Sequence, residues 1–93
     1  MTTPPPKPPL GIQVKYKDDQ IVTGALWMKW TAPLATVTVQ AIDNAGAKQR
    51  RVTLVLSAPD GRTRRRHFPP AHADRAIAWV AAFNAWQQAV HPR

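Results

Sequence analysis

The chain has 93 residues, enough for one small domain with a single modest core. It contains no cysteine, which excludes disulfides and zinc–thiolate sites, and no stretch is apolar over the length of a membrane span. The chain has thirteen lysines and arginines but only five aspartates and no glutamate, which gives a net charge of +8. This balance predicts an anionic partner: nucleic acid, an acidic protein surface or a phospholipid surface.

The first ten residues are rich in proline and predict an extended or disordered arm, followed by a single domain over residues 11–93. Five prolines among the first nine residues exclude a strand, because proline has no N–H to donate to a sheet. We expect this arm to make no core contacts, so that its deletion leaves the melting temperature nearly unchanged.

Alternation of apolar and polar residues predicts about five antiparallel strands joined by short connections. The second of them, residues 21–30, has apolar residues at both odd and even positions, which is typical of a strand covered on both sides. Tight turns are expected at Asp18-Asp19 and over residues 43–46. The expected strands are residues 12–17, 21–30, 34–42, 51–57 and 62–68.

Residues 50–68 predict a hairpin, and seven of the thirteen lysines and arginines lie between residues 48 and 66. Residues 58–61 supply the proline and glycine of its turn. Arginines occupy both faces of the return strand, which predicts an edge strand that tolerates their replacement. The alternatives are an edge charged against aggregation and a contact surface for an anion. The candidate nucleic-acid contacts are Lys29, Trp30, Lys48, Arg50, Arg51, Arg62, Arg64, Arg65 and Arg66.

Trp30 is included among these contacts because it lies at the end of the expected second strand, beside Lys29. An exposed tryptophan near an arginine-rich hairpin would be a stacking platform for unpaired bases. A position in the core is the alternative for this side chain.

A C-terminal helix is expected to begin between Ala71 and Asp74, with Asp74 at its cap or in its first turn. Its apolar residues cover about half of the circumference and should pack on the open side of the sheet. The opposite face has no charge from residue 76 to residue 90, which either an intermolecular contact or helix propensity explains. The candidate partner interface is Ala78, Ala81, Ala82 and Ala85.

The sequence carries no pattern typical of catalysis or metal binding. The aspartates lie at expected turns and at the helix start, without a second carboxylate type to pair with for acid–base chemistry. His67 and His72 have no third ligand nearby, and the four glycines are too far apart to form a phosphate-binding loop. We therefore expect no enzymatic activity, metal, cofactor or small-molecule substrate.

The hairpin VTLVLSAPDGRTRRRHF followed by the helix ADRAIAWVAAFNAWQQAV resembles the last part of small bacterial domains of the pleckstrin-homology type. In that family a C-terminal helix caps a strongly bent sheet. The likeness covers residues 51–90 and implies a non-enzymatic scaffold that binds proteins or lipids, with no site residue to carry over. The order of elements is also similar to that of sheet-then-helix proteins that bind single-stranded nucleic acid.

These patterns predict an α+β domain: a curved antiparallel sheet or partly open barrel of about five strands, capped by one C-terminal helix. The expected function is non-catalytic binding of nucleic acid, single-stranded or duplex, by phosphate neutralisation at the basic hairpin.

The alternative is a protein-interaction or structural module of a larger assembly, such as a phage-type module. In that case the proline-rich arm and the alanine face would contact a protein partner or a second copy. A membrane partner is not expected, because the helix lacks a basic polar face. The expected location is cytoplasmic or virion-associated.

Overall fold

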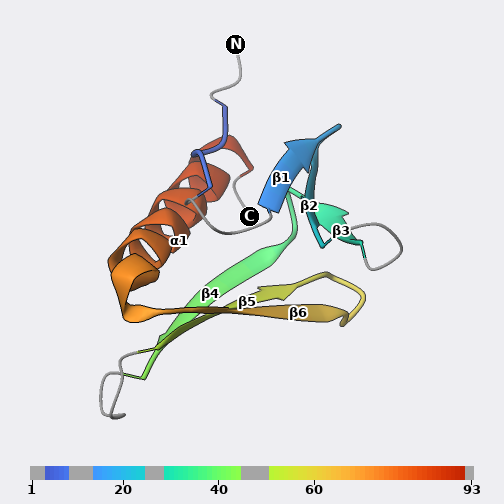
Figure 1. Ribbon diagram of the computed structural model, residues 1–93. Coiled ribbons are helices and arrows are strands. Elements are labelled where there is room, and N and C mark those ends of the chain that lie inside the picture. The colour runs from blue at the N-terminus through green and yellow to red at the C-terminus, as the bar shows by residue number, and fades with distance from the viewer. Residues whose placement is uncertain (1–3, 9–13, 25–28, 45–50, 92–93) are drawn as a thin grey trace.

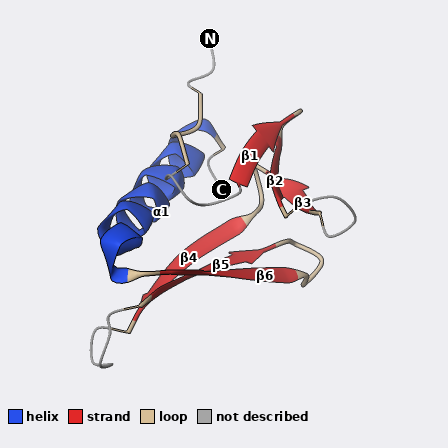
Figure 2. Cartoon of the chain, viewed as in Figure 1, coloured by secondary structure: helices blue, strands red, loops and turns tan. Residues whose placement is uncertain are grey.

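The computed structural model describes residues 4–8, 14–24, 29–44 and 51–91. These residues form six antiparallel strands in two three-stranded sheets, followed by one helix (Figures 1 and 2). The α+β class is therefore confirmed. The expected single sheet of about five strands is replaced by two sheets, and the described strands form no closed barrel.

The N-terminal sheet consists of β1 (Val14–Lys17), β2 (Gln20–Thr23) and β3 (Trp30–Pro33), in that order. Asp18 and Asp19 join β1 to β2 with φ angles of 50° and 63°. A two-residue type I′ hairpin loop requires this left-handed conformation at both positions, and aspartate tolerates it better than most residues. The predicted turn at these two residues is confirmed.

The expected long strand over residues 21–30 is wrong. β2 ends at Thr23, and Gly24 follows with a φ of 94°, a conformation that interrupts an extended strand. β3 begins only at Trp30, and residues 25–28 lie outside the described part of the chain. The expected third strand also begins late, because residues 34–36 form a turn between the two sheets.

The C-terminal sheet consists of β4 (Thr38–Asp43), β5 (Val52–Ser57) and β6 (Thr63–Phe68), in that order. The predicted basic hairpin is confirmed as β5 and β6, and β6 is an edge strand, as expected. In its turn, the Gly61 N–H donates to the Ala58 carbonyl over 3.0 Å. Gly61 has a φ of 95°, which explains the need for glycine there. Of the turn expected at residues 43–46, residues 45 and 46 lie outside the described residues.

The helix α1 (Pro70–Val90) packs against one face of the C-terminal sheet and contacts all three of its strands (Figure 1). It begins before the expected start because proline suits the first helical position, where its missing N–H needs no partner. Asp74 consequently lies beyond the first turn, contrary to expectation. The buried residues of the helix are Ala73, Ala76, Trp79, Val80, Phe83 and Gln87.

Side-chain amides of α1 bind main-chain carbonyls at and just before β4, the second edge strand of the C-terminal sheet. Asn84 Nδ2 donates to the Val39 carbonyl over 3.3 Å. Gln87 Nε2 donates to the carbonyls of Leu34 and Val37 over 2.9 and 2.8 Å. These bonds fix the helix against the turn between the sheets, and Gln87 is buried while it makes them.

The described part of the proline-rich arm lies on the domain, contrary to the expectation of an arm without contacts. The Tyr16 hydroxyl donates to the Pro6 carbonyl over 2.6 Å and accepts from Trp79 Nε1 over 3.1 Å. One half-buried hydroxyl on β1 therefore joins the arm to α1. Deletion of the arm should consequently lower the melting temperature, because it removes a bond partner of Tyr16.

We predict that Tyr16→Phe lowers the free energy of unfolding by about 1–2 kcal/mol, because Trp79 Nε1 and the Pro6 carbonyl both lose a partner. Burial raises the pKa of Tyr16, an effect that the hydrogen bond from Trp79 partly opposes. The unfolded chain therefore loses this proton first, and stability falls as pH rises above the usual tyrosine value near 10.

The check for Tyr16 is urea denaturation of the wild type and of Tyr16→Phe across alkaline pH. The stability difference between the two proteins should shrink as the pH rises. A constant difference would show that the hydroxyl does not hold these partners.

Candidate nucleic-acid interface

The register of the hairpin separates the arginines of β6 onto two faces. Arg64 pairs with Leu56 and Arg66 with Leu54, whereas Arg65 pairs with Val55. Both leucines are fully buried, on the inner face of the sheet. Arg64 and Arg66 therefore point inward and are half-buried, while Arg65 points outward and is exposed. The predicted alternation of these arginines is confirmed.

Two arginines on the inner side of the hairpin bind the N-terminal sheet. Arg66 Nη2 donates to Thr23 Oγ1 on β2 over 3.3 Å. Arg62 Nη2 donates to the Thr31 carbonyl on β3 over 3.1 Å, and its Cζ lies 5.9 Å from the centroid of the Trp30 ring. The N-terminal sheet thus lies on the same side of the C-terminal sheet as α1, as Figure 1 shows.

Arg62 is also held by the turn that precedes it. Its backbone N–H donates to Asp60 Oδ1 over 3.1 Å, and its Nε donates to Asp60 Oδ2 over 2.7 Å. The backbone hydrogen bond from Arg62, and then its side chain, hold the pKa of Asp60 below its usual value. Because both side chains are exposed, this ion pair orders the turn more than it stabilises the fold.

The fold should not tolerate replacement of the arginines equally. We predict that Arg66→Ala lowers the free energy of unfolding by about 1 kcal/mol, because it removes the bond to Thr23 and the packing of its stem. Arg65→Ala should change it by less than about 0.5 kcal/mol. Urea denaturation at one salt concentration checks this, and the two variants control each other for net charge. Equal losses would contradict the assignment of the two arginines to different faces.

We call the outward side of the C-terminal sheet the outer face. It is mostly exposed and polar, and it carries Arg65 and His67 on β6. His67 Nδ1 shares a hydrogen bond of 2.9 Å with Thr53 Oγ1 on β5, which fixes the imidazole ring on this face. The outer face comprises Thr38, Gln40, Ile42, Thr53, Val55, Ser57, Thr63, Arg65 and His67. None of these residues is an aspartate.

The other predicted contacts are spread around the molecule. Arg51 is exposed immediately before β5, at the end of the outer face nearest His67. Lys29 is exposed immediately before β3, on the N-terminal sheet. Lys48 and Arg50 lie outside the described residues. The predicted cations therefore do not form one continuous patch among the described residues.

Trp30 is 7% exposed, so the alternative that places it in the core is confirmed and the exposed stacking platform is wrong. Its ring faces the core of the N-terminal sheet, beneath the Arg62 guanidinium. No aromatic ring belongs to the outer face apart from the imidazole of His67. Binding there would consequently use the nucleic-acid backbone rather than base stacking.

Sequence reasoning missed several residues that accompany Arg65 on the outer face. Thr38, Gln40, Ser57 and Thr63 carry hydroxyl or amide donors of the kind that contact phosphates. Their position on the same face as Arg65 is readable in β5 and β6, where each expected strand boundary lies within one residue of the observed one. The β4 residues of the outer face could be assigned only from the pairing of β4 with β5, which the sequence alone does not reveal.

The described residues offer little for other chemistry. They contain no group of three or more histidines or carboxylates positioned to hold a metal ion. Within the same residues, no helix has the length and apolarity needed to cross a membrane. The chemical capacity of the outer face is therefore hydrogen bonding and charge attraction toward an anion.

Comparison of the chain with protein-family models, with curated proteins and with solved structures finds no match.

Proposed function

We propose that the protein is a non-catalytic binding module that holds the sugar–phosphate backbone of a nucleic acid on its outer face. The observation that carries this proposal is an exposed sheet face with Arg65, His67 and several neutral donors and without a carboxylate. Arg51 extends the positive charge at one end of this face. Cations and neutral donors together suit phosphate oxygens, which accept hydrogen bonds from both.

The proposal gives the arginines of the hairpin different roles. Arg65 would contact phosphate directly, whereas Arg62 and Arg66 already bind carbonyl and hydroxyl groups of the N-terminal sheet. These inner arginines would add long-range attraction without a specific contact. Binding should consequently be sensitive to salt and weakly dependent on sequence.

We predict that Arg65→Ala weakens binding of single-stranded DNA, RNA and duplex DNA, with little dependence on base sequence. The slope of log affinity against log salt should fall by about 0.7 for single strands and about 0.9 for duplex, because one phosphate contact is lost. The measurement is a fluorescence-anisotropy titration at several salt concentrations.

Lys17→Ala is the matched control for Arg65→Ala. Lys17 is exposed on β1 of the N-terminal sheet, away from the outer face, and its loss removes one charge. Equal weakening by both variants would show that net charge alone attracts the nucleic acid. An unchanged affinity and salt slope in Arg65→Ala would sink the proposed interface.

A protein-interaction or structural module is the second candidate, favoured by the exposed alanines of α1. Ala78, Ala81, Ala82 and Ala85 are all exposed, so a partner surface could approach the helix closely. Affinity for nucleic acid no greater than weak non-specific binding at physiological salt would favour this candidate. A test of self-association is then sedimentation of the wild type and of Ala81→Glu.

A further inference from the structure

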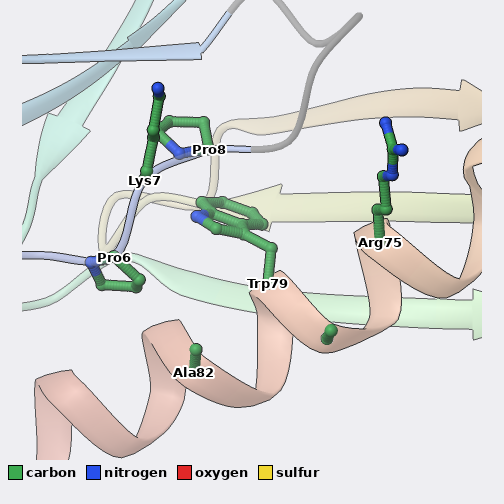
Figure 3. Close-up of a pocket in the computed structure, with 7 residues that line it drawn as sticks. Pro6, Lys7, Pro8, Arg75, Trp79 and Ala82 are labelled. Atoms are coloured by element: carbon green, nitrogen blue, oxygen red, sulfur yellow. The ribbon is translucent and has the colours of Figure 1, made fainter.

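A hollow of about 520 Å³ lies between the proline-rich arm and α1 (Figure 3). Its size falls in the range of about 300–1,000 Å³ typical of pockets for small molecules. It is a largely open hollow, and its walls are mostly apolar. The lining residues are Pro6, Lys7, Pro8, Arg75, Ala78, Trp79 and Ala82.

Hydrogen bonds inside the protein fix the shape of this hollow. Tyr16 binds the Pro6 carbonyl and Trp79 Nε1 through one hydroxyl group, so the arm and the helix are held at a set separation. The indole of Trp79 has no other polar atom to offer a ligand, and the two prolines have no N–H. The walls therefore favour an apolar body.

The charged groups of the hollow have one sign. Lys7 and Arg75 are exposed, and in Figure 3 their side chains extend on either side of the Trp79 ring. None of the described residues that line the hollow is a carboxylate. Positive charge on both sides of the ring suits an anionic ligand, and the Arg75 guanidinium can bind a carboxylate with two parallel hydrogen bonds.

We propose that this hollow binds a small amphipathic carboxylate. The apolar body of the ligand would lie against Ala78, Ala82 and the prolines, and its carboxylate would meet Arg75, with Lys7 adding attraction from the other side of the Trp79 ring. This site is separate from the outer face and does not depend on binding of nucleic acid there.

The first test compares 2-naphthoate with its neutral analogue 2-naphthamide, titrated into the full chain by calorimetry and by NMR of the tryptophan indole N–H signals. We expect saturable binding of naphthoate, about fivefold tighter than that of the amide. Arg75→Gln should remove this preference. Lys17→Gln, which removes the same charge from β1, should retain it.

The second test fills the hollow. Ala82→Leu should weaken naphthoate binding about tenfold, because the added atoms occupy the space of the apolar body. Ala81→Leu is the matched control, since Ala81 is an exposed alanine of the same helix that does not line the hollow. Circular dichroism and thermal melting should show that both variants are folded.

Three results would each overturn the proposal. They are the absence of saturable binding, equal affinity for naphthoate and naphthamide, and equal effects of the substitutions at residues 81 and 82. The last result would place any binding elsewhere on the helix.

Discussion

Replacement of Phe83 by alanine is expected to lower the free energy of unfolding by about 3–5 kcal/mol, the range for a large aromatic side chain removed from a core. Phe83 is fully buried, and its ring lies 5.5 Å from that of Trp79 and 5.6 Å from that of Trp86. The expected loss is a large fraction of the free energy of unfolding of about 5–15 kcal/mol that is typical of small domains.

Urea denaturation followed by circular dichroism measures this loss. Ala81→Glu is the control on the same helix and should change the stability by less than about 0.5 kcal/mol, because Ala81 is exposed. Similar losses in the two variants would show that the alanine face is also internal. A loss below about 1 kcal/mol for Phe83→Ala would contradict the packing of α1 on the sheet.

Replacement of Gln87 by leucine is expected to lower the free energy of unfolding by about 2–4 kcal/mol. The change keeps an apolar side chain of similar size but leaves the Leu34 and Val37 carbonyls without their donor. A buried carbonyl that loses its partner costs about 1–3 kcal/mol. The penalty should therefore exceed any gain from the more apolar side chain.

The neighbouring residue supplies a matched control for this experiment. Gln88→Leu makes the same chemical change at an exposed position of α1 and should leave the melting temperature nearly unchanged. A Gln87→Leu variant as stable as the wild type would mean that water replaces the amide at both carbonyls. Amide hydrogen exchange at the turn over residues 34–37 should also be faster in Gln87→Leu.

Local pattern was sufficient to predict the hairpin and the helix. In β5 and β6 the alternation of residues, the Pro-Asp-Gly turn and the charge of the return strand all indicate the same structure. The apolar stripe of α1 likewise predicted the buried positions of Val80 and Phe83. Only the helix start was displaced, because a proline that ends a sheet can equally begin a helix.

The break between β2 and β3 could not be predicted from alternation, because apolar residues occupy both parities from residue 21 to residue 30. Such a run hides the end of one strand and the start of the next. Gly24 is a local signal of the break, because glycine readily adopts the positive φ that it has here. With that break missed, the number of sheets was also missed.

The candidate site was predicted in part. The outward position of Arg65 follows from parity within β6, which the sequence contains. The inward contacts of Arg62 and Arg66 depend on the N-terminal sheet, about 30 to 40 residues earlier in the chain. The binding of the arm by Tyr16 is similarly non-local, and no composition rule for proline-rich segments predicts it.

The hydrogen bond from the Asn84 side chain of α1 to β4 affects whether the C-terminal sheet can add strands from other molecules in a concentrated solution. An open sheet can add a strand from another molecule at either edge, where main-chain groups are unpaired. At β4 the Val39 carbonyl already accepts a hydrogen bond from Asn84 Nδ2, so an incoming strand would have to displace this side chain. At β6 an antiparallel copy would bring arginine side chains within about 5 Å of one another. A side-chain hydrogen bond that occupies one edge and electrostatic repulsion at the other should therefore disfavour fibril-like stacking of this protein.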